Sequence, residues 1–317
     1  MHRIVFLDRA TLAPDVVLKR PAFAHDLVEY DRTSADETFE RVEDATIILV
    51  NKVDLREDLL ARLPKLKLIA VAATGYDCVD VAAAKARGIV VSNIRGYAKA
   101  TVPEHTFALI LALARSIVPY RASLLSGRWQ EAAQFCYFDY PIVDLAGRRL
   151  GVVGGGVLGG RVAEIGRAFG MDVVVHDPKP PVVTPAHVAF DELIETSDVI
   201  TLHCPLTAET RGFIAMEQFR RMKKKPLIVN TARGGLIVEE DLLAALDQGL
   251  VAGAGLDVTL PEPPPVGGSF MKLAAHPKVV VTPHTAWASI EAQQTLADQL
   301  IDNVENFAAG RPSNVVG

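Results

Sequence analysis

Short runs of hydrophobic, mostly β-branched residues recur along the chain, and a segment with helical spacing follows most of them. The hydrophobic residues within each run are consecutive, a pattern typical of strands in parallel sheets that are covered on both faces. Strands and helices that alternate in this way predict βαβ units, and therefore an α/β protein. The predicted strands are Arg3–Asp8, Ala45–Asn51, Leu66–Ala73, Ile89–Asn93, Leu150–Gly154, Val173–Asp177, Val199–His203, Leu227–Thr231, Gly253–Asp257 and Val279–His284.

Two long helical stretches separate these strands into two sets. Thr101-Val102-Pro103-Glu104 has the composition of a capping box with proline in the first helical position, and it opens the apolar run HTFALILALARSIVPYRASLLSG. The second stretch runs from about Ala288 to Ala309 and ends at Gly310-Arg311-Pro312. If both helices pass between lobes, the chain forms two doubly wound parallel-sheet domains. We expect residues 1–98 plus 289–317 to form one domain, and residues 99–288 to be inserted in it as the other.

The segment Gly127–Gly147 has little helical periodicity but is rich in aromatic residues. Exposing that many aromatic side chains to solvent would be costly, so the segment is expected to pack against something. Two interpretations remain open: it packs on its own domain, or it is an arm that covers a second subunit. The aromatic residues are Trp129, Phe135, Tyr137, Phe138 and Tyr140.

The composition excludes several classes of protein. Of 317 residues, 50% are hydrophobic and 22% are charged, which fits a globular chain with a substantial core and not a disordered one. The length is near twice the ~150 residues of a typical domain, in keeping with two domains. The net charge of −5 leaves no broad basic surface for nucleic acid.

The cysteines and the N-terminus indicate the compartment. Cys78, Cys136 and Cys204 are too few and too scattered for a disulfide framework or a zinc ribbon, and no metal site is expected. The N-terminus MHRIVFLDRA lacks the layout of a signal peptide, and no apolar run approaches the ~18 residues of a membrane span. We therefore expect a soluble, cytoplasmic protein without nucleic-acid or membrane partners.

A glycine-rich turn directly follows the predicted strand Leu150–Gly154. Gly154, Gly156 and Gly159 satisfy G-x-G-x-x-G, and apolar residues at helical spacing come after them. The first glycine of this pattern permits a tight turn, the second lets the backbone approach a pyrophosphate, and the third allows close helix–strand packing. The helix N-terminus then offers free N–H groups and a positive dipole to the phosphates. In this strand–turn–helix context the motif predicts a dinucleotide site.

An acidic residue follows the motif at the expected distance. Asp177 ends the next strand, where a carboxylate can bind the ribose hydroxyls and repel a 2′-phosphate, so NAD is favoured over NADP. Lys179 nearby weakens that preference for NAD. The alternative interpretation of Asp177 is a solvated aspartate at the end of a strand. A phosphate-binding NTPase loop is disfavoured, because Gly160 and Arg161 stand where Lys and Ser/Thr are required.

Three polar residues follow later strands of the same set. In open parallel sheets ligands bind outside the carboxyl ends of the strands, so residues there are candidates for the active site. Arg233 follows the strand LIVNTA, Glu262 lies among prolines after Gly253–Asp257, and His284 ends VVVTPH. Each has a plain alternative, respectively a surface cation, a loop anion and a packed imidazole.

Together the three residues suit the interconversion of a 2-keto acid and a 2-hydroxy acid. That reaction moves a hydride at C2 and a proton at the oxygen, and histidine exchanges protons near neutral pH. A carboxylate partner fixes the histidine tautomer and favours the imidazolium. Arginine can bind the substrate carboxylate with two parallel hydrogen bonds, while NAD carries the hydride.

With these residues the chain resembles the D-isomer-specific 2-hydroxyacid dehydrogenases over nearly its whole length. Within that family it is similar to the glycerate dehydrogenases, also called hydroxypyruvate reductases; NKVDL (51–55) and QFCYFDYPIVDLAG (134–147) support this narrower placement. The stretches that carry the family resemblance are ATGYDCVD (73–80), GVVGGGVLG (151–159), HCPLTAETRG (203–212), VNTARGGLI (229–237), GAGLDVTLPEP (253–263) and TPHTAW (282–287).

The resemblance implies a Rossmann-type NAD-binding domain inserted into a flavodoxin-like substrate-binding domain, and a homodimer built by the cofactor domains. It implies that Arg233, Glu262 and His284 are catalytic: Arg233 binds the substrate, His284 is the acid–base and Glu262 its partner. Substrate contacts are implied for Asn51, Thr74, Gly75, Arg233 and His284. Cofactor contacts are implied for Thr74, Gly154, Gly156, Val157, Leu158, Gly159, Asp177, Cys204, Pro205, Thr231, Ala232, Asp257, His284 and Ala286.

Several functions stay open at the level of the sequence. The leading interpretation is an NAD-dependent reductase of hydroxypyruvate, and of glyoxylate. D-lactate and 3-phosphoglycerate dehydrogenases are alternatives within the family. Formate dehydrogenases resemble a variant of this fold with glutamine at the position of Glu262, so Glu262 argues against formate as the substrate. An NAD-sensing scaffold that kept the fold is the alternative from another class of protein.

Overall fold

The computed structural model describes residues 1–177 and 186–317, which form two compact units. One unit consists of residues 1–97 and 288–317, and the other of residues 98–287. The boundaries predicted from the sequence each lie one residue further along the chain.

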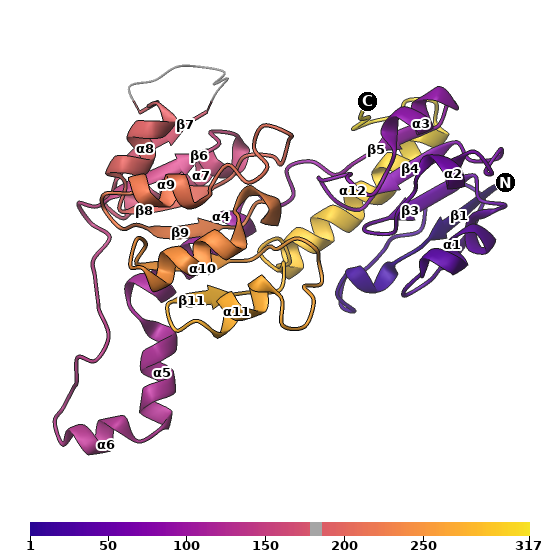
Figure 1. The fold of residues 1–317 in the computed structure, drawn as a ribbon. Helices are drawn as coiled ribbons and strands as arrows, with labels where there is room; N and C mark the ends of the chain where they lie inside the picture. The colour runs from indigo at the N-terminus through magenta and orange to yellow at the C-terminus, as the bar shows by residue number, and fades with distance from the viewer. Residues whose placement is uncertain (178–185) are drawn as a thin grey trace. The chain divides into compact units, whose positions relative to one another are not determined.

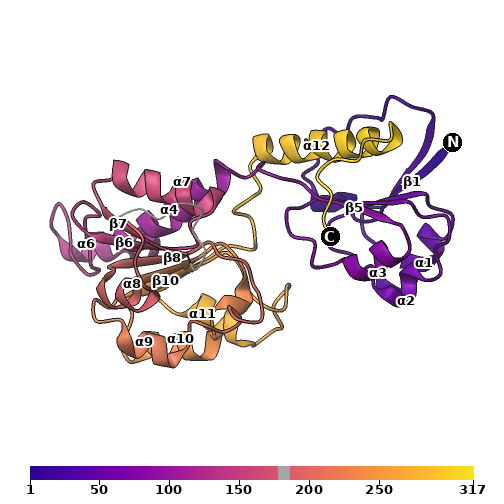
Figure 2. The ribbon, with the colours of Figure 1, turned by 90° about the horizontal axis from the view of Figure 1, so that it is seen from above.

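The discontinuous unit is built on a parallel sheet of five strands: β1 (His2–Phe6), β2 (His25–Glu29), β3 (Ile47–Val50), β4 (Leu68–Val71) and β5 (Val90–Ser92). Their order, β2-β1-β3-β4-β5, is the flavodoxin-like one. On one face lie α1 (Ala35–Val42), α2 (Glu57–Leu60) and α3 (Val81–Ala86), and on the other lies α12 (Ile290–Ala308) (Figure 2). The two covered faces explain why the central strands are hydrophobic throughout: every residue of β3 and β4 is buried.

The second unit has a parallel sheet of six strands: β6 (Arg149–Val153), β7 (Asp172–His176), β8 (Val199–Leu202), β9 (Leu227–Asn230), β10 (Gly253–Leu256) and β11 (Val279–Val281). The order is β11-β10-β9-β8-β6-β7. A single parallel bridge between Val175 and His187 adds a minimal strand beside β7. With that bridge the sheet has the dinucleotide-binding order 3-2-1-4-5-6 and one further strand, which confirms the predicted doubly wound fold.

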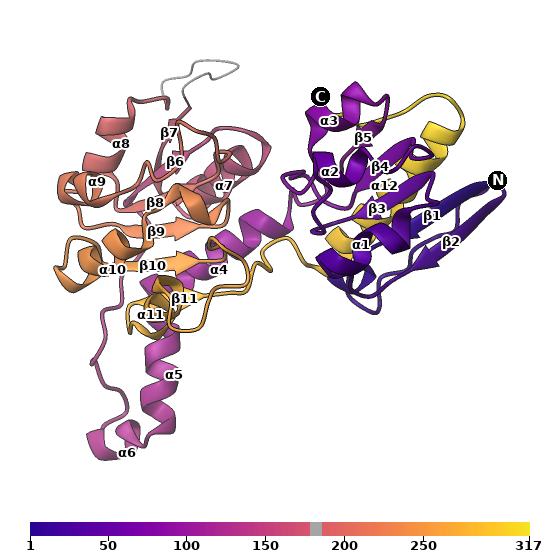
Figure 3. The same cartoon turned by 45° about the vertical axis from the view of Figure 1, so that its right-hand side comes forward.

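Helices cover both faces of this second sheet (Figures 1 and 3). One face carries α4 (Thr101–Ala114) and α7 (Val157–Ala168). The opposite face carries α8 (Phe190–Thr196), α9 (Met216–Arg221), α10 (Glu239–Asp247) and α11 (Ser269–Ala275). Because all strands are parallel, their carboxyl ends share one edge of the sheet, and this edge bears the predicted site residues of the unit.

The structure differs from the sequence prediction in its first unit at β2. Its residues are only partly buried, because β2 lies at the edge of the sheet and pairs with β1 alone. The sequence HDLVE therefore lacks the continuous apolar run that marked the other strands.

The predicted helix after Thr101 is also different. Its N-cap is Ala100, and the Thr101 hydroxyl donates to the carbonyl oxygen of Ala286 instead of closing a capping box with Glu104. The helix ends at Ala114, and Ser116, with φ of 51°, turns the chain by 56° into α5 (Ile117–Leu125). The short helix α6 (Arg128–Ala132) follows in the aromatic segment, at the far end of α5 from the sheet (Figure 3).

Among the described residues, no single helix has the length and hydropathy of a membrane span, although the bent pair α4 and α5 reaches them together.

Candidate active site

The glycine-rich turn joins β6 to α7, and its three glycines meet different spatial demands. Gly154 has φ of 100°, and a Cβ on it would lie 2.7 Å from the backbone nitrogen of Cys204. A Cβ on Gly159 would overlap the carbonyl oxygen of Gly154. A Cβ on Gly156, in contrast, would meet nothing within 4 Å. The first and third glycines therefore hold the turn together, while the second leaves its backbone open to a ligand.

The open side of the turn is a hollow of about 640 Å³ within this unit. Gly156 is the N-cap of α7, so the first N–H groups of the helix, beginning at Val157, face this end with the positive side of the helix dipole. Lys99, Arg161 and Glu164 also line it, and Arg161 Nη1 pairs with Glu164 Oε2 at 2.6 Å. The backbone donors and the open space together fit a pyrophosphate.

Asp177 lies beside the turn and is bonded to it. Its Oδ2 accepts a hydrogen bond of 3.1 Å from the backbone N–H of Gly155. The carboxylate is thereby fixed close to the glycine backbone, where the resemblance expects it to meet the cofactor ribose. Lys179, which weakened the expected preference for NAD, lies outside the described residues.

The segment after β8 packs against Gly154. Burial raises the pKa of the Cys204 thiol to about 11, so the thiol is uncharged and unreactive at neutral pH. Burial lowers the pKa of His203 to about 4, which keeps that imidazole neutral. Thr201 Oγ1 lies 2.9 Å from His203 Nε2. The neutral imidazole of His203 thus contacts strand β8, which it directly follows.

The turn after β9 places Arg233. Its backbone carbonyl accepts from Asn230 Nδ2 at 2.8 Å, and its Nη1 donates to the carbonyl of Ala232 at 2.8 Å. Thr231 is buried, with its hydroxyl 3.0 Å from that of Thr106. The next residue, Gly234, opens a 3₁₀ turn (Gly234–Leu236), and a Cβ on it would overlap the carbonyl group of Thr259.

Thr259 links the Arg233 turn to Glu262 and His284. Its backbone N–H donates to Glu262 Oε1 at 3.2 Å, while Glu262 Oε2 lies 2.6 Å from His284 Nδ1. The two side chains are 33% and 29% exposed, so the pair is open to a small ligand. Because a carboxylate can only accept, His284 Nδ1 carries the proton of this bond and Nε2 is left for another partner.

The Asp257 carboxylate is buried completely beside this pair. Its Oδ1 accepts from the Thr282 hydroxyl at 2.6 Å and from the Thr285 N–H at 2.8 Å, and its Oδ2 accepts from the Ala286 N–H at 3.0 Å. His105 of α4 donates to the Thr282 hydroxyl oxygen, with Nε2 at 2.9 Å. These contacts surround the carboxylate with the chain's own donors.

The first unit presents its own polar residues at the carboxyl edge of β1, β3 and β4. The Asn51 N–H donates to both oxygens of Asp8 at 2.9 and 3.1 Å, and the Lys52 N–H to Oδ2 at 2.6 Å. Asn51 is buried, and its side-chain oxygen has no hydrogen-bond partner in the part of the chain that the structure describes. The Thr74 hydroxyl donates to the Ile94 carbonyl at 2.8 Å, and Gly75 follows in the same loop.

The sequence prediction missed the residues that hold the site residues in place. Asp8, Thr282 and Thr259 follow strands β1, β11 and β10, so their position at strand ends was a usable signal. His105 gave none, because it lies in an apolar helical run. The contacts of Asp8, Thr282 and His105 are made with residues far along the chain, which the spacing of a motif does not reveal.

Comparisons with known proteins identify the family of the chain. The family model "D-isomer specific 2-hydroxyacid dehydrogenase, NAD binding domain" matches residues 107–286. The chain is 51% identical over 315 residues to a glycerate dehydrogenase of Methylorubrum extorquens, across 99% of this chain and 98% of that protein. It is 38% identical over 322 residues to a hydroxypyruvate reductase of Blautia hydrogenotrophica, across 99% of both.

A solved structure extends the likeness to the fold. The D-lactate dehydrogenase of Aquifex aeolicus, complexed with NAD and lactic acid, superposes with a TM-score of 0.81 at 28% identity, across 98% of this chain and 96% of that one. The glycine turn of a dinucleotide site, the His284–Glu262 pair and the matched domain now point the same way. The chain belongs to the D-isomer specific 2-hydroxyacid dehydrogenase family and is an NAD-dependent oxidoreductase of that family.

Proposed function

We propose that this protein is an NADH-dependent hydroxypyruvate reductase, or glycerate dehydrogenase in the reverse direction, that also reduces glyoxylate. The observation that carries the proposal is the 2.6 Å contact between His284 Nδ1 and Glu262 Oε2, beside the turn that bears Arg233. The names of two relatives that align with almost the whole chain support the choice of substrate.

His284 is the proposed acid–base. Its Nδ1–H is engaged by Glu262, so Nε2 exchanges the proton with the substrate oxygen. The negative Glu262 stabilises the imidazolium that donates during reduction. NAD, when bound, supplies or accepts the hydride at its nicotinamide ring.

Arg233 is the proposed substrate-binding cation. Its guanidinium lies at the carboxyl edge of β9 and can hold the substrate carboxylate while polarising the carbonyl to be reduced. We assign further substrate contacts to Asn51, Thr74 and Gly75, which makes residues 1–98 plus 289–317 the substrate-binding domain. The unpartnered side-chain oxygen of Asn51 supports this assignment, because a buried polar atom without a partner suits a ligand.

The proposed cofactor contacts fall into two groups. Gly154, Gly156, Val157, Leu158 and Gly159 hold the pyrophosphate and Asp177 the ribose hydroxyls. Thr74, Cys204, Pro205, Thr231, Ala232, His284 and Ala286 contact the nicotinamide half. The Asp177 carboxylate repels a 2′-phosphate, so NADH should give the higher kcat/KM, and Asp177→Ser should narrow the difference from NADPH. A wild-type preference for NADPH would contradict the assignment.

The decisive experiment separates an enzyme from an NAD-sensing scaffold. Purified protein is mixed with NADH and a panel of 2-keto acids, and the loss of absorbance at 340 nm is followed. We expect the highest kcat/KM with hydroxypyruvate, and Arg233→Ala should abolish turnover while NADH still binds. Binding of NADH without turnover of any keto acid would support the scaffold instead.

We propose that the protein is a homodimer formed through the cofactor units. Apolar side chains on α5, α6 and the following segment are exposed: Leu125 by 67%, Phe135 by 87% and Phe138 by 81%. Tyr137 and Tyr140 instead pack edge-on against Tyr120 of α5, so part of the segment packs on its own unit. An exposed apolar surface of this kind is typical of an interface.

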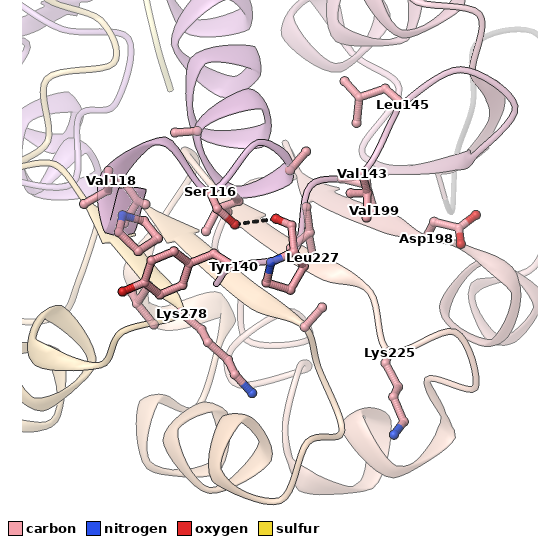
Figure 4. Close-up of a pocket in the computed structure, with 18 of the residues that line it drawn as sticks. Ser116, Val118, Tyr140, Val143, Leu145, Asp198, Val199, Lys225, Leu227 and Lys278 are labelled. Carbon is pink, nitrogen blue, oxygen red and sulfur yellow. Dashed lines mark hydrogen bonds between the residues drawn. The ribbon is translucent and has the colours of Figure 1, made fainter. Parts of the chain in front are cut away.

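A hollow of about 410 Å³ lies at the junction of α4 and α5 and suits an apolar side chain of a second copy. Figure 4 shows Val143, Leu145, Val199 and Leu227 around it, and the Ser116 hydroxyl, which donates to the Pro141 carbonyl at 2.6 Å. The hollow and the exposed apolar side chains of α5 and the segment after α6 belong to the same unit. A two-fold interface brings the same surface of two copies together, so side chains of one copy can meet the hollow of the other.

Sedimentation equilibrium tests the dimer. The double substitution Phe135→Ser/Phe138→Ser should convert a dimer to monomer at micromolar concentration. Val266→Ser, which changes a fully exposed apolar residue away from the arm, should stay dimeric. A monomeric wild-type protein would contradict the proposal.

We propose a cytoplasmic location on the three cysteines, which are free in the structure. Fractionation of cells that express the protein should place the hydroxypyruvate-dependent oxidation of NADH in the cytosolic fraction. Recovery of that activity with membranes or in the medium would contradict it.

A further inference from the structure

We infer that Asp257, supported by Thr282 and His105, is the positioning residue that holds His284 in its catalytic conformation. The inference rests on the proposed acid–base role of His284. The resemblance gave Asp257 a cofactor contact, whereas the structure shows three successive backbone N–H groups bonded to this one residue. They are the N–H groups of His284, Thr285 and Ala286.

The conformation of His284 needs such an anchor. Its φ is 55°, in the left-handed region that residues with a side chain rarely adopt. The His284 N–H donates to the Asp257 carbonyl oxygen at 2.7 Å, and the next two N–H groups donate to the Asp257 carboxylate at 2.8 and 3.0 Å. Asp257 thereby binds three consecutive N–H groups, of which that of His284 also lies 3.1 Å from the Thr282 carbonyl oxygen. A left-handed residue persists only where its surroundings fix it in this way.

The anchor is itself fixed by the fold. Asp257 directly follows β10 and Thr282 directly follows β11, and these strands are neighbours in the sheet. The Thr282 hydroxyl lies 2.6 Å from Asp257 Oδ1 and 2.9 Å from His105 Nε2. The carboxylate can only accept, so Thr282 must donate its single proton to Asp257 and accept from His105. The chain of donors therefore runs from His105 on α4 through Thr282 to Asp257.

The burial of Asp257 fits this positioning role. The Asp257 side chain has no exposed surface, while those of His284 and Glu262 are 29% and 33% exposed. A buried carboxylate must be satisfied by donors, and three donors of this turn already supply them. The His105 imidazole, which donates to Thr282, has its Nε2 3.7 Å from Asp257 Oδ1.

Substitution of Thr282 tests the inference with little change of shape. Thr282→Val removes the hydroxyl and leaves Asp257 short of one donor, so His284 should lose its fixed orientation. We expect kcat for hydroxypyruvate to fall about tenfold while the Kd for NADH stays within twofold, and Thr282→Ser should restore kcat. His105→Leu should produce a smaller loss of the same kind. Thr196→Val on α8 is the matched control, because its hydroxyl donates to Glu192 away from this network.

A second measurement does not depend on turnover. The His284 Nδ1–H bonded to Glu262 should give a downfield proton NMR signal, assigned by its loss in His284→Asn, and Thr282→Val should shift or broaden it. This signal remains informative if hydroxypyruvate proves not to be the substrate. A failure of the proposed function can therefore be distinguished from a failure of the inference about Asp257. An unchanged kcat and signal in Thr282→Val would overturn the inference. Equal loss in Thr282→Ser, or weakened NADH binding, would also overturn it.

Discussion

His284 donates its Nδ1 proton to Oε2 of Glu262 across 2.6 Å, so the carboxylate charge lies directly against the imidazole. Glu262→Gln keeps the size and an accepting oxygen at this position but removes the charge. The imidazolium that gives its proton during reduction is then less stable, and we expect kcat to fall 10- to 100-fold. Stopped-flow reduction of hydroxypyruvate by NADH measures this change, with the Kd for NADH expected to remain the same.

A second glutamate provides the control for this substitution. Glu240 accepts a hydrogen bond from the Ser269 hydroxyl on α11, whereas Glu262 is bonded to Thr259 and His284. Glu240→Gln should keep kcat within twofold. If both substitutions reduce kcat equally, the loss in Glu262→Gln reflects general damage and not the charge beside His284.

Two adjacent glycines of α7 should respond oppositely to alanine. A Cβ on Gly159 would overlap the Gly154 carbonyl oxygen, which belongs to the turn itself and cannot move without distorting it. A Cβ on Gly160 would approach nothing closer than the Gly155 carbonyl oxygen at 3.8 Å. Gly159→Ala should therefore lower Tm and abolish NADH binding. Gly160→Ala should stabilise the helix by about 0.5–1 kcal/mol.

Differential scanning calorimetry and NADH fluorescence titration check this pair. The two variants carry the same added methyl group one residue apart, so composition and helix propensity are matched. Similar Tm and NADH affinity in both variants would show that the close packing of Gly159 on Gly154 does not matter.

Local pattern was sufficient to predict the strands with consecutive apolar residues, and the glycine turn between β6 and α7. It was insufficient where a contact made far along the chain decides the structure. β2 is stable because it pairs with β1, and Thr101 bonds Ala286 instead of capping its own helix. The left-handed φ of His284 follows from Asp257, 27 positions earlier, so no local preference of the TPHTAW stretch could predict it. The strand-end positions of Arg233, Glu262 and His284 were predictable, and the contacts that support them were not.

Asp8 should control the affinity of the substrate through the loop after β3. Its carboxylate accepts the N–H groups of Asn51 and Lys52, and burial raises its pKa above the usual range of an aspartate. As the pH falls through that raised pKa, the carboxylate takes up a proton and holds the loop less firmly. The KM for hydroxypyruvate should therefore rise at acid pH, and Asp8→Ala should raise it about tenfold at neutral pH.

Steady-state kinetics between pH 4.5 and 7.5 test the role of Asp8. The Kd for NADH should change little in Asp8→Ala, because the glycine turn belongs to the other unit. Asp26→Ala provides a control on β2, where the carboxylate pairs with Arg3 at the surface. A KM unaffected by the loss of Asp8 would show that the loop does not need this anchor.

His203 should make the stability of the protein depend on pH. Desolvation lowers its pKa from 6.5 to about 4 in the folded protein, so between these values the unfolded chain binds a proton that the folded chain does not. Acid therefore favours unfolding: the stability is complete above pH 6.5 and is lost as the pH falls towards 4. From pH 7.5 to pH 5 the expected loss of stability is up to about 2 kcal/mol.

His203→Gln cannot take up this proton. The loss of stability between pH 7.5 and pH 5 should therefore be smaller by that amount, whatever the effect of the substitution on stability at pH 7.5. Urea unfolding at both pH values and at one protein concentration measures the difference, with His25→Gln on β2 as the control. A slope equal in wild type and His203→Gln would show that this imidazole is not kept neutral by burial.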